Sequence, residues 1–147
     1  AGHNPPIIAR VGQKPELMVG PRSLILGARE GVKYRAAELT MEPGDRILLY
    51  TDGVTEANDH FNGFYGIERL MAVMDRSAEA QLNDQIRMVT DDIAEFTRHA
   101  TQFDDITMLL LRYDGVPKSG ESLLDKEDVP PVVTPISDAV NVLLDQE

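Results

Sequence analysis

The chain has 147 residues, of which 42% are hydrophobic and none is cysteine, and its formal net charge is -11. This length and composition suit one globular domain, and the lack of cysteine excludes disulfides and thiolate metal sites. An acidic chain repels a polyanion, so nucleic acid is not an expected partner. No apolar run approaches the roughly 18–20 residues that span a bilayer, and no signal peptide is visible. We therefore expect a cytoplasmic location.

The first third of the chain predicts several strands. PPIIAR (5–10) and PELMV (15–19) are short apolar runs on either side of a turn, and KYRAAELTM (33–41) predicts a further strand. The Pro-Gly turn at 42–45 leads into RILLYT (46–51). Because that run is apolar except at its ends, it is typical of a strand buried on both faces.

Two helices and a last strand follow. A helix is expected over about 65–75, and a second over about 78–98 with Ser77 as its N-cap. ITMLLLRY (106–113) predicts a second buried strand. The apolar stripe of the second helix consists of Leu82, Ile86, Val89, Ile93 and Phe96.

This order of elements favours an α+β fold, with two helices against one face of a largely antiparallel sheet. From Asp114 the character changes, because 114–147 is rich in Gly, Pro, Ser and acidic residues. We expect it to be a linker or tail, and 1–113 to be the folded part. The chain begins at Ala1 rather than at a methionine, so we expect it to be cut from a longer protein.

Carboxylates mark the ends of the two most apolar strands. Asp52 follows RILLYT, whereas Asp104 and Asp105 precede ITMLLLRY. If these strands are antiparallel neighbours, Asp52 and Asp104 converge at one edge of the sheet. Oxygen ligands without cysteine or clustered histidine favour a hard cation such as Mg²⁺ or Mn²⁺. The competing interpretation is an ordinary Asp-Gly turn and a solvated Asp-Asp pair.

Five short segments stand out along the chain: AGHNPP (1–6), LILG (24–27), EPGDRILLYTDGVTEA (42–57), YGIERL (65–70) and QFDDITMLLLR (102–112). In their order and spacing they resemble the SpoIIE-type branch of the metal-dependent protein phosphatases, the PPM family. The resemblance covers roughly residues 1–113. It implies a β-sandwich flanked by helices and hydrolysis of phosphoserine or phosphothreonine by a water that two Mn²⁺ or Mg²⁺ ions activate.

The resemblance also implies roles for individual residues. Asp52 and Asp104 match the metal ligands of the family, the backbone of Gly53 is a further candidate, and Asp105 is expected to support the site. In the family, further ligands come from an earlier part of the domain. The chain therefore holds about half of the ligand set, and we expect it to be inactive alone.

The resemblance implies a phosphorylated regulatory protein as substrate, such as an anti-sigma factor antagonist, and an upstream sensor or receiver domain. The alternative is a truncated or degenerate module that binds a partner without hydrolysis. A haloacid dehalogenase-type phosphatase is excluded, because Tyr50 stands where that class requires its nucleophilic aspartate.

Overall fold

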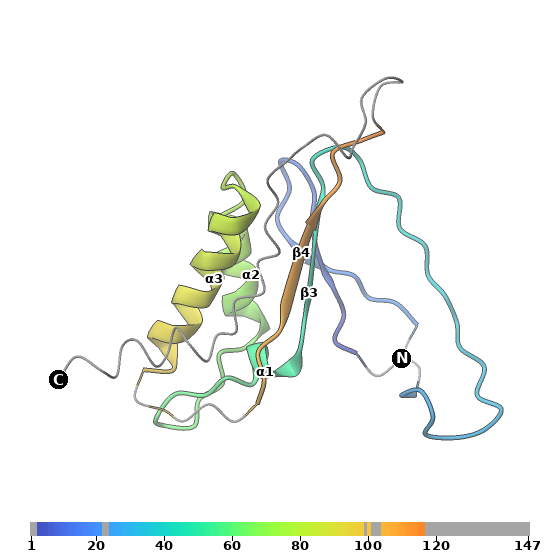
Figure 1. Ribbon diagram of the computed structural model, residues 1–147, viewed down its shortest axis with the longest axis horizontal. Coiled ribbons are helices and arrows are strands. Elements are labelled where there is room, and N and C mark those ends of the chain that lie inside the picture. The colour runs from blue at the N-terminus through green and yellow to red at the C-terminus, as the bar shows by residue number, and fades with distance from the viewer. Residues whose placement is uncertain (1–2, 22–23, 99, 101–103, 117–147) are drawn as a thin grey trace, which may run out of the picture.

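The computed structural model describes residues 3–21, 24–98, 100 and 104–116. Four strands form one sheet in the order β2-β1-β3-β4, with every neighbouring pair antiparallel (Figure 1). The four predicted strands at these places are confirmed, although each is shorter than expected. Their bounds are β1 Ile7–Ala9, β2 Glu16–Leu17, β3 Arg46–Tyr50 and β4 Met108–Arg112.

Both long helices lie against the same face of the sheet, as Figure 1 shows. They are α2 (Ile67–Arg76) and α3 (Leu82–Phe96), and a short helix α1 (Asp52–Thr55) follows β3 directly. The α+β prediction with two helices on one face is therefore confirmed. The core between sheet and helices consists of Ile7, Leu48, Tyr50, Val54, Tyr65, Leu70, Val73, Met74, Val89, Ile93 and Leu110.

The strand predicted at 33–41 does not exist. This segment belongs to a long connection between β2 and β3 that extends away from the sheet (Figure 1) and carries neither helix nor strand where it is described. A strand needs a neighbour that accepts and donates its backbone hydrogen bonds. Among the described residues no strand pairs with 33–41, and the side chains of this segment are largely exposed. Propensity alone was therefore misleading.

The prediction that Ser77 begins the second helix is also wrong. Ser77 ends α2 instead, because its buried hydroxyl donates to the Val73 carbonyl oxygen at 2.6 Å. Its oxygen is thus held at the C-terminal end of α2 rather than at the start of α3. The N-cap of α3 is Gln81, which makes no side-chain cap hydrogen bond. Asp84 lies in the first turn of α3, where its negative charge interacts favourably with the positive end of the helix dipole.

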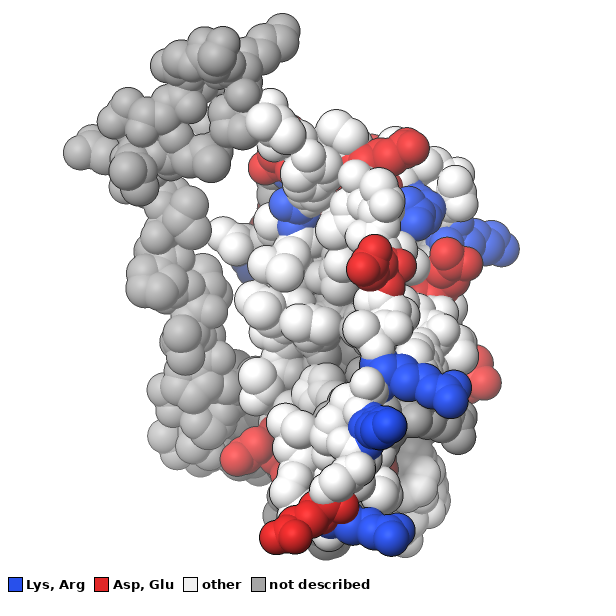
Figure 2. All heavy atoms as spheres, turned by 90° about the vertical axis from the view of Figure 1, so that its right-hand side faces the viewer, with Lys and Arg blue, Asp and Glu red and all other residues white. Residues whose placement is uncertain are grey.

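The two faces of the sheet differ in burial. On the helix side Leu48 and Leu110 are buried, whereas on the other side Leu109 and Leu111 remain 51% and 48% exposed. The prediction that β4 is buried on both faces is therefore wrong among the described residues. Figure 2 views this side, where uncharged side chains form a band with charged ones mainly along a margin and at the ends. Leu109 and Leu111 lie two residues apart on the same face of the edge strand β4, and exposed apolar surface of this kind favours contact with another element.

One polar pair crosses the core. Gln85 is fully buried within the apolar stripe of α3, and its Oε1 accepts from Arg46 Nη1 of β3 at 2.5 Å. Its amide nitrogen donates to the Met74 carbonyl oxygen of α2 at 3.2 Å. Burial, helped by the positive charge of Arg112, lowers the pKa of Arg46. Gln85 therefore joins β3, α2 and α3 through one side chain, which the apolar period of the sequence could not indicate.

A second polar cluster joins the two helices. Asp92 of α3 accepts hydrogen bonds from the Tyr65 hydroxyl at 2.8 Å and from Arg69 Nε at 2.7 Å, and it also pairs with Arg76. The Arg69 guanidinium lies 4.9 Å from the ring centroid of Phe96, close enough for a cation–π contact. Burial would raise the pKa of Asp92, but hydrogen bonds from Arg69, Tyr65 and Arg76 outweigh it and hold that pKa below its ordinary value.

Two further findings concern the C-terminal segment and membrane-spanning helices. The linker or tail predicted for 114–147 lies outside the described residues except for 114–116. No helix in the described part of the chain is long and apolar enough to cross a membrane.

We predict that Asp92→Asn weakens acid sensitivity as well as stability. A carboxylate with a lowered folded pKa stabilises the fold above its unfolded pKa, and this stabilisation is lost as pH falls through the folded value. The wild-type free energy of unfolding should therefore drop as pH falls through the lowered folded pKa of Asp92, and Asp92→Asn should flatten this drop. At neutral pH the variant should lose about 1–2 kcal/mol, since both arginines are partly exposed and solvent-screened.

Urea unfolding at each pH measures this effect, and exposed Asp75→Asn on α2 is the control. An acid slope that is the same for Asp92→Asn and wild type would contradict the role given to Asp92.

Candidate active site

The register of β3 and β4 places the two predicted carboxylate segments beside each other. Tyr50 pairs with Met108. One residue further, the Thr51 amide donates to the Thr107 carbonyl oxygen at 3.0 Å. The strands predicted to be antiparallel neighbours are indeed so, and this brings the residues after β3 to the residues before β4.

Thr51 extends this contact beyond the strands. Its hydroxyl donates to the Asp105 carbonyl oxygen at 2.9 Å, and its Oγ1 accepts from the Thr107 amide at 3.0 Å. One side chain thus binds the backbone on both sides of Ile106. The segment 104–107 is thereby fixed against the start of α1, although Asp104 and Asp105 belong to no strand or helix.

Gly53 makes the closest approach between the two segments. A Cβ atom at this position would lie 2.5 Å from the Asp105 carbonyl oxygen and 3.4 Å from the Asp104 carbonyl carbon. Real Cβ atoms do not approach backbone atoms at 2.5 Å. Residue 53 must therefore be glycine for the backbone of α1 to lie directly on that of 104–105.

Both candidate carboxylates are exposed at this junction. The Asp52 Oδ1 accepts from its neighbouring Gly53 amide at 3.1 Å, and the Asp104 Oδ1 accepts from the Asp105 amide at 2.7 Å. Carboxylates that lie on adjacent backbone segments and face water suit a hard divalent cation. Among the described residues, however, no group of three or more His, Cys, Asp or Glu side chains could hold a metal. The described residues thus bring two carboxylate-bearing segments into contact but show no complete metal site.

A short hairpin, residues 58–64, follows α1. Asn58 and Phe64 form an antiparallel bridge, and the Asp59 carboxylate accepts from the amides of Phe61 and Gly63 at 2.9 and 2.7 Å. At its base, the Gly66 amide donates to the Thr55 carbonyl oxygen of α1 at 3.0 Å. The hairpin is therefore attached to the helix that carries Asp52.

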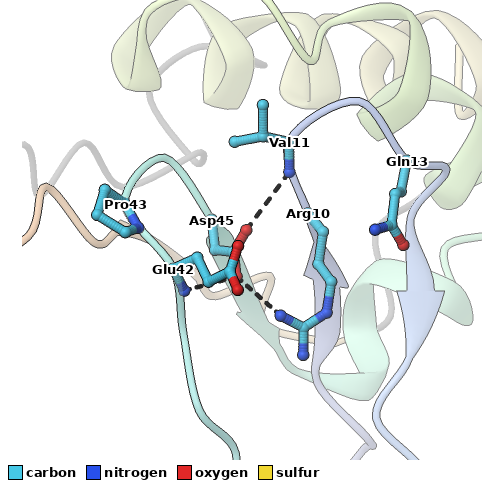
Figure 3. A pocket seen from close by; sticks show the side chains of 6 residues that line it. All are labelled: Arg10, Val11, Gln13, Glu42, Pro43 and Asp45. Atoms are coloured by element: carbon cyan, nitrogen blue, oxygen red, sulfur yellow. Dashed lines mark hydrogen bonds and ion pairs between the residues drawn. The ribbon is translucent and has the colours of Figure 1, made fainter.

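A different polar cluster lies at the opposite end of β3. The Asp45 carboxylate accepts from Arg10 Nη1 at 2.9 Å, from the Glu42 amide at 3.0 Å and from the Val11 amide at 3.4 Å (Figure 3). A pocket of about 340 Å³ opens beside it. Because Asp45 precedes β3 and Asp52 follows it, this pocket is not part of the candidate site. Its lining residues are Arg10, Val11, Gln13, Glu42, Pro43 and Asp45.

Residues 1–114 match the family model described as Stage II sporulation protein E (SpoIIE), which is more than half of the 147-residue chain. This chain belongs to the SpoIIE family. It is a SpoIIE-type domain of the PPM phosphatases, as its five motifs predicted. The reaction class of the family is therefore phosphate ester hydrolysis.

The curated proteins that are similar to this SpoIIE-type chain are longer than the part that matches it. Protein IcfG of Synechocystis sp. is 31% identical over 111 residues, which is 74% of this chain and 17% of that protein. Phosphoserine phosphatase RsbU of Bacillus subtilis (strain 168) is 26% identical over 115 residues, which is 76% of this chain and 33% of that protein. The chain thus spans well under half of either curated relative.

A solved structure agrees with the fold. The SiaA-PP2C domain of Pseudomonas aeruginosa superposes with a TM-score of 0.62 at 29% identity, covering 76% of this chain and 44% of that one. The described sheet and helices therefore correspond to part of a PPM-type fold.

Two features of this SpoIIE-type site escaped prediction from the sequence. The four-residue helix α1 was not predicted, although its N-cap residue Thr51 is of a type that is favoured at that position. The hairpin at 58–64 was also missed, although Asn-Gly at 62–63 is a strong hairpin signal. Asn62 indeed has a positive φ of 62°.

We predict that Gly53→Ala disrupts the junction between α1 and the segment before β4. The new methyl group would overlap the Asp105 carbonyl oxygen. That oxygen belongs to the backbone, so it cannot move aside as the end of a flexible side chain could. The segments must separate, which should cost about 1–3 kcal/mol of stability. Urea unfolding measures the loss. Gly20→Ala is the matched control, since its Cβ would meet no atom closer than 3.9 Å. Equal stability of the two variants would contradict the close approach.

Proposed function

We propose that the complete domain containing this chain hydrolyses phosphoserine or phosphothreonine in a regulatory protein. The observation that supports the proposal is the junction of Thr51 and Gly53 with the backbone of 104–107 in a chain of the SpoIIE family. The similar protein from B. subtilis is described as a phosphoserine phosphatase, which supports the substrate class. A phosphorylated anti-sigma factor antagonist is the substrate we expect, with a sensor or receiver domain upstream.

The donor set supports a divalent cation. We propose that the carboxylates of Asp52 and Asp104 hold Mn²⁺ or Mg²⁺, with Asp105 and the Gly53 backbone in supporting positions. When bound, such ions lower the pKa of water and neutralise negative charge on a phosphoryl group. The exposed oxygen donors and the lack of cysteine agree with a hard cation. Within this chain, the glycine cradle and the Thr51 hydrogen bonds hold the two ligand-bearing segments at fixed spacing.

The open face of the sheet bears on how much of the domain is needed. Leu109 and Leu111 are about half exposed, and the chain covers 44% of the solved PP2C domain that it resembles. We propose that another part of the domain packs on this face as the second layer of a sandwich and brings the remaining ligands. Residues 1–113 would then be one part of the phosphatase domain. The alternative, a partner-binding module without activity, would need no such completion.

We predict that Asp52→Asn or Asp104→Asn in the complete domain lowers Mn²⁺-dependent hydrolysis of p-nitrophenyl phosphate by at least about a hundredfold. Each substitution removes one anionic metal ligand and keeps the side-chain size, so thermal stability without added metal should be unchanged. Exposed Asp75→Asn is the control and should keep wild-type turnover. Near-wild-type turnover in either variant would remove that residue from the site.

We also predict that the 147-residue chain alone hydrolyses no p-nitrophenyl phosphate above background, whereas the complete domain does so with Mn²⁺. The reason is that the described residues supply fewer than three clustered ligands. Matched assays of both proteins at equal concentration check this. Robust turnover by the short chain would show that its own residues complete the site. No turnover by the complete domain would favour the partner-binding alternative.

A further inference from the structure

Two aromatic side chains on the hairpin at 58–64 are exposed without an internal role. Phe61 and Phe64 are 78% and 68% exposed, and each stands out from a chain in which aromatic residues make up only 5%. The His60 ring lies 3.8 Å from that of Phe61, tilted by 40°, so the aromatic surface extends beyond one ring. Large apolar rings facing water gain free energy when a partner covers them.

The backbone that carries these rings is held by a dense set of hydrogen bonds. The Asp59 amide donates to the Gly63 carbonyl oxygen at 2.9 Å, and the Asn62 amide donates to the Asp59 carbonyl oxygen at 3.0 Å. These add to the two bonds that the Asp59 carboxylate accepts from within the hairpin. The rings are thus presented on an ordered support, which lowers the entropy cost of binding a partner.

The base of the hairpin is anchored on both sides. The Tyr65 amide donates to the Ala57 carbonyl oxygen at 2.7 Å, while the buried Tyr65 ring reaches Asp92 of α3 through its hydroxyl. On the other side Gly66 binds Thr55 of α1. Figure 1 shows this loop at the end of the sheet where α1 and the start of β4 lie. The aromatic pair is therefore held at the same end of the molecule as Asp52 and Asp104.

We propose that Phe61 and Phe64 dock the phosphoprotein substrate, by covering an apolar patch beside its phosphorylated residue. The inference rests on the proposed function and adds the surface that selects a protein over a small phosphate ester. Binding energy from such a remote contact orients the reacting group and is absent when the substrate is too small to reach it.

The charges around the hairpin define the partner further. From Ile47 to Glu68 inclusive the chain has four acidic residues and no lysine or arginine. The arginines that flank this stretch, Arg46 and Arg69, are hydrogen-bonded to Gln85 and Asp92. A partner surface that meets this region should therefore be apolar or basic around the phosphorylated residue. An anionic membrane, the other surface to which exposed aromatic rings bind, is disfavoured by this local charge and by the net charge of -11.

The test compares two substrates in the complete domain. The probes are p-nitrophenyl phosphate and a purified anti-sigma factor antagonist phosphorylated on serine. The variant Phe61→Ala/Phe64→Ala should lose at least about tenfold in kcat/KM for the phosphoprotein, since buried aromatic contacts dominate such interfaces. Its kcat/KM for p-nitrophenyl phosphate should stay within about twofold of wild type, because that substrate is too small to reach the docking surface.

Two further variants sharpen the result. Val11→Ala/Val116→Ala removes two exposed apolar side chains at the other end of the sheet and should change neither substrate. Phe61→Leu/Phe64→Leu keeps apolar surface and should recover part of the phosphoprotein activity.

Each remaining outcome decides the question. An unchanged kcat/KM for the phosphoprotein in the alanine variant would overturn the docking role, as would an equal loss on both substrates. Wild-type binding to phosphatidylglycerol vesicles that the alanine variant loses, with phosphoprotein turnover unchanged, would assign the rings to a membrane instead. Failure of the wild-type domain to hydrolyse either substrate would overturn the proposed function itself, which separates the two failures.

Discussion

The arrangement of the candidate site depends on the antiparallel contact between β3 and β4 and its extension past the strand ends. Strand pairing alone would bring Thr51 opposite Thr107. The Thr51 hydroxyl then holds the backbone on either side of Ile106, and Gly53 lets α1 approach 104–105 more closely than any other residue would allow. Two acidic segments that would repel each other in solution are thereby fixed together. The hydroxyl and the backbone amide of Thr51 form hydrogen bonds that join the two segments.

The rest of the described structure supports this junction from one side. The helices α2 and α3 bury the inner face of the sheet, and two polar links, one through Gln85 and one through Asp92, fix the helices to the sheet and to each other. The outer face has no such cover in the described part of the chain. A sheet with one finished and one open apolar face is consistent with the coverage of 44% of a PP2C domain.

The hairpin at 58–64, which carries the proposed docking surface, is joined to the elements around the candidate site. Through Tyr65 it shares the polar cluster of α3, and through Gly66 it shares the end of α1. The proposed docking surface and Asp52 are therefore carried by connected elements.

The sequence by itself indicated the four strands of the sheet, the two long helices, the α+β class and the family, because apolar periodicity and five motifs in register are local properties. It also predicted that the segments carrying Asp52 and Asp104 lie together, since both flank strongly apolar strands. Tertiary structure alone decided which segments find a partner. KYRAAELTM has strand propensity but no neighbouring strand among the described residues. Ser77 is a residue type that can cap the start of a helix, but its hydroxyl donates to the Val73 carbonyl oxygen of the preceding helix α2. Gln85 is polar yet buried, because Arg46 and Met74 satisfy it. In each case the fold decides which hydrogen-bond partner is within reach. The partner of Gln85 lies far along the chain, and that of Ser77 lies in the preceding helix rather than the following one. The segment 33–41 has no partner strand among the described residues. No local pattern encodes that choice.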